Sequence, residues 1–204
     1  EPVAIISKLR GSVKQKLFSA KKYRTKVQVN SPIFHETELK TKSRAFAKVV
    51  YLDDGSFISI YPETEIRING TLENRIINKQ IDLLTGIIQV NIVKQASNNF
   101  KLITPHSELS CEKCSFWIIS DEENGDQFYK KDGLAVVNNP TLDKSLKLAV
   151  DSTLVSKKDM LIEKNQSTVT EIKYLELLLL DADEQPPEID MEMNENISTQ
   201  ESSP

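Results

Sequence analysis

Apolar and polar residues alternate along most of the chain. In "AFAKVVYL" (45–52) and "SFISIY" (56–61), every second side chain falls on the same side of an extended backbone. Period-two alternation is typical of half-buried β-strands, because successive side chains of a strand point to opposite faces. No stretch before residue 170 carries an apolar stripe of helical period. The pattern therefore predicts an all-β fold. Further short apolar runs continue it: "TEIRIN", "IDLL", "GIIQVNIV", "NFKLIT", "SFWII" and "GLAVV".

Turn residues separate these runs at intervals of about 8 to 12 residues, the spacing typical of a sandwich, barrel or roll of strands about 5 residues long. Asp54-Gly55 between two alternating runs predicts a hairpin with a tight primed turn, which needs positive φ at its centre. The other turn signals are Asn69-Gly70, Thr85-Gly86, Asn98-Asn99, Asn124-Gly125, Asp132-Gly133 and Asn138-Asn139-Pro140.

Residues 141–180 continue with a weaker pattern. "SLKLAVDSTLVSKKDMLIEKNQSTVTEI" alternates well enough for two or three more strands, and "TEIKYLELLLLDADEQ" fits either a short helix or one more strand. In a helix, Ile172, Leu175 and Leu179 lie on one stripe with Leu178 beside it. So apolar a helix at the edge of a domain packs either on its own sheet or on a partner, and of the two we favour docking against another protein.

The C-terminal end, residues 181–204, has eight acidic residues and no Lys or Arg. Since the whole chain of 204 residues carries −4 and this segment −8, the first 180 residues carry +4. This segment has too few large apolar side chains to offset the conformational entropy lost on ordering. We therefore expect a disordered acidic tail or linker. The sequence therefore divides into 1–140, 141–180 and 181–204.

Several functional classes find no support. Hydrophobic residues make up 39% of the chain and no apolar run approaches the length of a membrane span. The Lys and Arg residues form no dense stripe with interleaved aromatics, so we expect no nucleic-acid partner. A nucleophile elbow and a glycine-rich phosphate loop are absent, so we expect no enzyme, no catalytic residues and no cofactor. The chain begins at Glu1 rather than Met, which suggests that an export signal has been removed.

The acidic stretch at residues 48–68 raises the question of a carboxylate site. It holds Asp53, Asp54, Glu63 and Glu65 around a glycine. A calcium loop needs several oxygen ligands in a compact run, and that spacing is missing. We therefore interpret these carboxylates as solvated turn and edge residues and expect no bound metal.

The two cysteines leave three possibilities open. Cys111 and Cys114 can form a local disulfide, as in an exported protein. They can ligate zinc together with His106 and His35, the two histidines of the chain. They can also remain unpaired thiols packed as small hydrophobes. Trp117 in the nearby "SFWII" is expected in the core rather than in a ligand-stacking site.

Five motifs in the same order give the chain a resemblance to the FecR domain family. "SRAFAKVVYLDDGSFISIYPETEIRI" (43–68) resembles the family pattern S-x-A-x-V-x-L-x-DGS-x-I-x-I-x-P-x-T-E-I. "IDLLTGIIQVNI" resembles its strand pair L-x-x-G-x-x-x-V-x-V, and "FKLITPHSEL" its F-x-V-x-TP segment. "KCSFWIISDEENGDQFYKKDGLAVVNN" is similar to the following acidic hairpin, and "VAIISKLRGSVKQKL" to the preceding strand pair. The resemblance covers about residues 1 to 140. It departs from the family where Lys113-Cys114 replaces Gly-Thr.

The resemblance implies an extracytoplasmic, periplasmic bacterial module without enzymatic activity, built as a roll or solenoid-like stack of hairpins. Founding members of the family sense an outer-membrane receptor and regulate a sigma factor. Because nothing in this sequence resembles their helical anti-sigma segment, we favour a scaffold component of an envelope assembly that binds protein partners. The alternatives are a signal-transducing regulator of a receptor and sigma factor, and a module that binds carbohydrate or peptidoglycan.

Expected partner contacts are the hairpin tips and the leucine-rich segment, because exposed strand edges and tips can add a partner strand. The residues concerned are Asp53, Asp54, Gly55, Glu123, Asn124, Leu175, Leu178 and Leu179.

Overall fold

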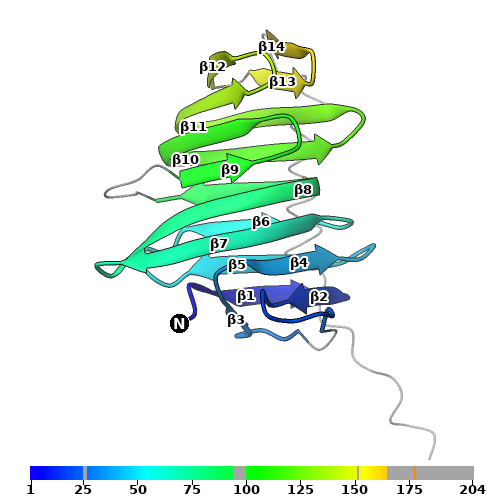
Figure 1. Ribbon diagram of the computed structural model, residues 1–204, viewed down its shortest axis with the longest axis vertical. Helices are drawn as coiled ribbons and strands as arrows, with labels where there is room; N and C mark the ends of the chain where they lie inside the picture. The colour runs from blue at the N-terminus through cyan, green and yellow to red at the C-terminus, as the bar shows by residue number, and fades with distance from the viewer. Residues whose placement is uncertain (25–26, 94–99, 151, 165–176, 178–204) are drawn as a thin grey trace, which may run out of the picture.

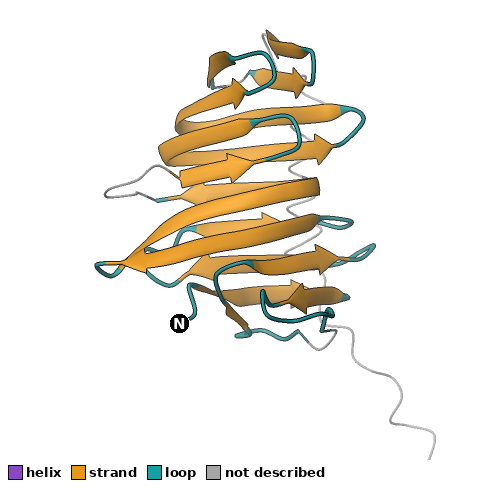
Figure 2. Ribbon diagram, in the orientation of Figure 1, coloured by secondary structure: helices purple, strands orange, loops and turns teal. Residues whose placement is uncertain are grey.

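The computed structural model describes residues 1–24, 27–93, 100–150, 152–164 and 177 (Figure 1). Nearly all of its regular structure is β-strand (Figure 2), so the predicted all-β class is confirmed. The strands are β1 (Ala4–Arg10), β2 (Val13–Lys16), β3 (Pro32–Ile33), β4 (Thr37–Thr41), β5 (Phe46–Tyr51), β6 (Phe57–Ile60), β7 (Glu65–Glu73), β8 (Ile76–Ile92), β9 (Phe100–Ile103), β10 (Glu108–Asp121), β11 (Gly125–Asn139), β12 (Lys144–Leu148), β13 (Thr153–Lys157) and β14 (Met160–Lys164).

The strands form one continuous sheet that folds back on itself into two layers. Layer A runs β3-β1-β5-β6, then the C-terminal half of β8, and on through β10 and β11 to β13 and β14. Layer B runs β2-β4-β7, then the N-terminal half of β8, and on through β9, β10 and β11 to β12. Because β12, β13 and β14 all belong to this sheet, it passes residue 140 without a break.

The main core lies between the layers. Ile6 and Ile58 of layer A and Leu39 and Ile66 of layer B are all fully buried in one hydrophobic cluster. Alternation along each strand supplies these inward side chains, as the sequence pattern indicates.

Three strands are far longer than the predicted length of about 5 residues. β8 has 17 residues, β10 has 14 and β11 has 15, and each passes from one layer to the other. β8 changes layer near Gly86 (φ +108), where any side chain would overlap Thr64. β11 changes layer near Gly133 (φ +88), where a side chain would overlap the carbonyl of Lys113. The expected turns at Thr85-Gly86 and Asp132-Gly133 are therefore wrong, because these glycines serve close backbone approach inside strands.

The tight turn between β7 and β8 also lies elsewhere than expected. Asn69-Gly70 is inside β7, and the hairpin closes at Asn74-Arg75, whose φ angles are 51° and 67°. Glu73 pairs directly with Ile76, so this is a two-residue loop with the two positive φ values of a primed turn. The expected turn at Asn98-Asn99 lies outside the described residues.

The β5–β6 hairpin exists where "DDGS" predicts it, but its turn is longer than expected. The N–H of Tyr51 donates to the carbonyl of Ser56 at 2.8 Å, which encloses four loop residues. Gly55 has φ +75, whereas Asp54 is not among the residues with positive φ. A two-residue primed turn at Asp54-Gly55 is therefore wrong.

Candidate functional site

The acidic loop between β5 and β6 encloses a buried lysine. Lys79 of β8 donates from Nζ to Asp53 Oδ2 at 2.7 Å and to Asp54 Oδ2 at 3.1 Å. The side chains of Lys79 and Asp53 are 0% and 6% exposed, and that of Asp54 is 19% exposed. Asp53 Oδ2 also accepts the N–H of Ile77 at 2.9 Å. The loop carboxylates are thus fixed to the neighbouring hairpin of layer B.

This arrangement corrects the expectation of solvated carboxylates for Asp53 and Asp54, whereas Glu63 is exposed as expected. Asp54 also accepts two hydrogen bonds from Ser56, at 2.8 Å from its N–H and 2.8 Å from its hydroxyl. Burial, followed by the negative charges of Asp53 and Asp54, raises the pKa of the nearby Tyr51 phenol. Since Asp53 is largely out of solvent, we no longer propose it as a direct partner contact.

Lys79 was not predicted as a site residue, although its position in the hydrophobic pattern of the sequence pointed to a buried charge. It occupies an inward position of β8, in register with Ile77, Ile81 and Leu83, which are all buried. A lysine in an inward register requires a buried anion, because an unpaired buried charge is costly. The acidic loop supplies two carboxylates.

The β10–β11 hairpin tip is exposed and acidic. Glu122, Glu123 and Asn124 form the loop between paired residues Asp121 and Gly125, and all three are exposed. Asp121 Oδ1 accepts the N–H groups of Glu123 and Asn124 at 3.0 and 2.6 Å and the side-chain amide of Asn124 at 2.8 Å. The backbone bond from Asn124, the largest effect, together with that from Glu123, lowers the pKa of Asp121 below its ordinary value. The predicted contact residues Glu123 and Asn124 therefore sit on a preorganised turn.

A buried carboxylate anchors this hairpin to the preceding loop. Asp126 is fully buried and accepts hydroxyl hydrogen bonds from Thr104 at 2.6 Å, Ser107 at 2.7 Å and Ser120 at 2.7 Å. His106, which the sequence places in a loop, lies there and brings Nε2 to 2.9 Å from the carbonyl oxygen of Glu122. The hydrogen bonds to Asp126 thus fix the strand ends below the hairpin tip, which the spacing of these residues in the sequence does not reveal.

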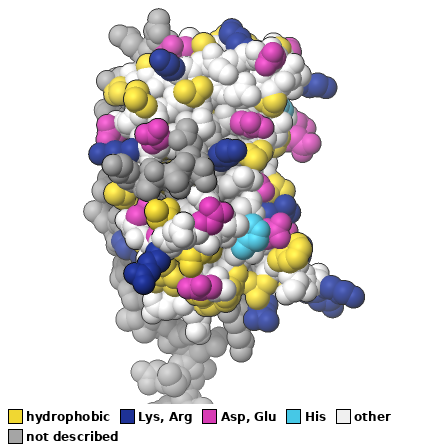
Figure 3. Space-filling model, turned by 60° about the vertical axis from the view of Figure 1, so that its left-hand side comes forward, with side chains coloured by type: hydrophobic (Ala, Val, Ile, Leu, Met, Phe, Trp, Pro, Cys, Tyr) yellow, Lys and Arg dark blue, Asp and Glu magenta, His cyan; other side chains and the backbone are white. Residues whose placement is uncertain are grey.

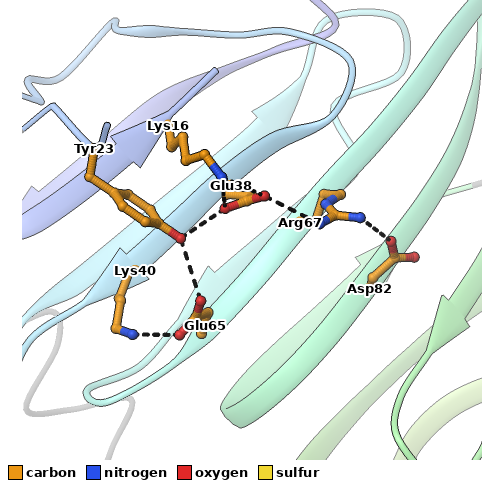
Figure 4. Close-up of polar contacts among 7 residues, drawn as sticks. All are labelled: Lys16, Tyr23, Glu38, Lys40, Glu65, Arg67 and Asp82. Carbon is orange, nitrogen blue, oxygen red and sulfur yellow. Dashed lines mark hydrogen bonds and ion pairs between the residues drawn. The ribbon is translucent and has the colours of Figure 1, made fainter. Parts of the chain in front are cut away.

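The outer face of layer B carries a network of charges (Figure 4). Glu38 of β4 accepts hydrogen bonds from Tyr23 at 2.9 Å, from Lys16 at 3.2 Å and from Arg67 at 3.2 Å. Burial alone would raise the pKa of Glu38, but these donors outweigh it and lower the pKa below 4.5. Glu65 pairs with Lys40 at 2.5 Å and also accepts the Tyr23 hydroxyl at 3.4 Å. The arrangement spans four strands and ends at Asp82, which lies 3.9 Å from Arg67.

The histidines and cysteines are not brought together in the way a zinc site requires. Among the described residues, no three His, Cys, Asp or Glu side chains cluster closely enough to hold a metal ion. His35 Nδ1 accepts the N–H of Gly70 at 3.2 Å, far along the chain from His106 at its loop. The structure joins Cys111 and Cys114 by a disulfide, with Cα atoms 6.1 Å apart, at the register shift where β10 changes layer. Oxidation of this pair in the native protein stays a prediction.

Two further predictions concern apolar residues. Trp117 is buried, as expected, but it belongs to a second, smaller cluster rather than to the main core. Leu175, Leu178 and Leu179 lie outside the described residues. On the face drawn in Figure 3, hydrophobic, acidic and basic side chains are interspersed among the coloured atoms.

Comparisons with known proteins place this fold. Two crystal structures described as "a putative anti-sigma factor from Parabacteroides distasonis ATCC 8503" align with a TM-score of 0.57 and 16% sequence identity. Each alignment covers 68% of this chain, and 63% and 64% of the respective crystallised chains, so this chain spans less than two thirds of their length. At this identity the likeness shows a shared fold.

No curated protein sequence matches this chain significantly. Within the described residues, no helix is both long and apolar enough to cross a membrane. The family model described as "FecR protein" matches residues 37–128. This region extends from β4 to the start of β11 and contains the acidic β5–β6 loop, Lys79 and the β10–β11 hairpin tip. The resemblance to the FecR family is therefore confirmed over residues 37–128.

Proposed function

We propose that this chain is the sensing part of an extracytoplasmic signalling regulator, which acts by binding a protein partner and not by catalysis. The observation that carries the proposal is the FecR match over residues 37–128. The fold shared with the Parabacteroides distasonis structures supports the same reading. These findings favour the signalling alternative of the sequence analysis over the scaffold that we first preferred.

A location outside the cytoplasm agrees with the family match, and such an oxidising compartment would allow the predicted Cys111–Cys114 disulfide to persist.

We assign the partner contact to the β10–β11 hairpin tip. Its two glutamates, Glu122 and Glu123, are exposed and sit on a turn held by Asp121 and by the buried Asp126 beneath it. A turn held in one conformation loses little entropy on binding, which favours affinity. Two adjacent carboxylates select a basic surface on the partner and speed its approach.

The test is genetic and uses the whole gene in its native host. Deletion should change the transcript levels of a small, defined set of operons, and the wild-type gene should restore them. A Glu122→Lys and Glu123→Lys variant should fail to restore them at an equal protein level. Glu73→Lys provides the matched control, because Glu73 is exposed beside the β7–β8 turn at a different site.

Each outcome discriminates between functions. If deletion leaves the transcripts unchanged but removes an envelope structure, the signalling function is rejected and the scaffold function is supported. Full restoration by the variant with both glutamates replaced would reject the tip as the contact while leaving the signalling role intact.

A further inference from the structure

The outer face of layer A is aromatic, in contrast to the charged outer face of layer B. Phe116 and Ile118 of β10 point into the main core, so Trp117 between them points outward. The same alternation turns Phe46 of β5 and Tyr129 of β11 outward. We call this set the aromatic face; it comprises Phe46, Tyr61, Trp117 and Tyr129, with Ile87 and Ile119 packed against them.

The aromatic face is continuous across five neighbouring strand positions. The rings of Phe46 and Tyr61 meet edge to face with centroids 5.4 Å apart, and those of Tyr61 and Trp117 lie 5.0 Å apart. Trp117 stands directly opposite Tyr129 in the β10–β11 pair. Aromatic pairs at these separations attract each other beyond simple burial of area. The result is a stripe that runs across the strands.

The burial of this face indicates that something covers it. The four rings are 4%, 1%, 6% and 6% exposed, in chain order. Polar residues on the same face are shielded as well, with Ser59, Gln89 and Ser115 each under 9% exposed. On the opposite face, by comparison, the side chains of Lys40 and Arg67 are 47% and 41% exposed. Neighbours within a single layer cannot shield both large rings and small hydroxyls so completely.

The chain itself has a segment suited to this role. Ile172, Leu175 and Leu179 form one apolar stripe when the segment 172–180 is helical. Leu177 is helical and 61% exposed in the structure. At 100° per residue it falls about 170° from the centre of that stripe. Its exposure is what a helix with its leucine stripe turned toward the protein would give.

The length of chain available also fits. β14 ends at Lys164, and three strand spacings, from β14 through β13 and β11 to β10, separate it from Trp117. These spacings amount to about 14 Å. Seven residues, 165–171, precede the leucine stripe and can reach about 23 Å when extended.

We infer that the leucine-rich segment 172–180 of this chain docks on the aromatic face as an intramolecular cover, with Ile172, Leu175 and Leu179 against Tyr61, Trp117 and Tyr129. The acidic residues 181–204 then follow directly from this docked segment. This assignment selects packing on the protein's own sheet, the alternative that the sequence left open beside the favoured contact with another protein.

Trp117 provides a direct readout because it is the single tryptophan of the chain. In the full chain, Leu175→Asp with Leu179→Asp should shift the tryptophan emission to longer wavelength and raise its quenching by acrylamide several-fold. Leu177→Asp is the matched control, since that side chain is exposed, and it should leave both signals as in the wild type. Equal shielding of Trp117 in all three proteins would overturn the inference.

A second measurement does not depend on a disruptive charge. A photoreactive amino acid in place of Leu179 in the full chain should crosslink within the same molecule to β10 or β11 peptides, as mapped by mass spectrometry. Crosslinks that join two copies, or that fall only outside layer A, would overturn the assignment and identify a different occupant. Neither experiment involves Glu122 or Glu123, so its failure is distinct from failure of the proposed function.

Discussion

The buried ion pairs of Lys79 give the sharpest test of the fold. Lys79→Met keeps much of the length and apolar character of the side chain while removing its charge. It leaves Asp53, 6% exposed, without the cation 2.7 Å from its carboxylate. Removing one partner of a buried ion pair costs about 3–5 kcal/mol, because the other charge stays buried and uncompensated. Since Asp54 is 19% exposed and regains some water, we expect the lower end, about 3 kcal/mol.

The assay is equilibrium unfolding in urea, followed by Trp117 fluorescence and far-ultraviolet circular dichroism, whose transitions should coincide if unfolding is two-state. With a slope of about 2 kcal/mol per molar urea, the midpoint should fall by about 1.5 M. Lys40→Met is the control. Its Nζ pairs with Glu65, but its side chain is 47% exposed, so the cost should stay below about 1 kcal/mol.

A double-mutant cycle completes the test. Asp53→Asn in the Lys79→Met background should cost much less than Asp53→Asn alone, because the two groups contact each other. If Lys79→Met destabilises the protein no more than Lys40→Met does, the buried ion pair does not hold the β5–β6 loop and the reasoning fails.

Three further expectations follow from single positions. Gly86→Ala should lower the free energy of unfolding by about 3 kcal/mol, because φ is positive there and the added methyl group would overlap Thr64. Gly55→Ala should cost only about 1 kcal/mol, because its turn leaves open space for a side chain. Equal costs would contradict the close approach of Gly86 to Thr64. Because the pKa of Glu38 is lowered in the folded state, its stabilisation is present above its ordinary value of 4.5 and is lost as the pH falls below it. Between about pH 6 and about pH 3.5, Glu38→Gln should therefore lose less stability than the wild type, and equal losses would argue against the network. When the protein is purified from its native host and then unfolded, thiol labelling should find no free thiol at Cys111 and Cys114 until reductant is added. Replacing both cysteines by Ser should lower the free energy of unfolding by about 2 kcal/mol. Two reactive thiols before reduction would contradict the disulfide.

Glycine shows where local sequence signals mislead. Asn69-Gly70, Thr85-Gly86 and Asp132-Gly133 all read as turns, and all three lie inside long strands. At each of them the missing side chain makes room for a residue distant in sequence, such as Val3 beside Gly70 or Thr64 beside Gly86. A turn glycine and a close-approach glycine look the same until the partner segment is known.

The candidate contacts show the same division. The exposed β10–β11 tip follows from its local signal, because Asn124-Gly125 and its acidic neighbours need only nearby residues to make a turn. The fixed conformation of the β5–β6 loop does not follow from a local signal, because Lys79 lies 26 residues from Asp53 along the chain. The hydroxyl anchors of Asp126 likewise come from Thr104 and Ser107, across the β9–β10 loop.

The sequence by itself determined the all-β class and the inward face of each strand, because period-two alternation is a local property of the chain. Its ordered motifs also determined the FecR resemblance. Only the tertiary structure decided which strands run long enough to change layers, which acidic groups are buried, and that one outer face is charged while the other is aromatic. These features depend on contacts between segments far apart in the chain. Layer B presents Lys40 and Arg67 to solvent, while layer A turns Trp117 outward and still shields it.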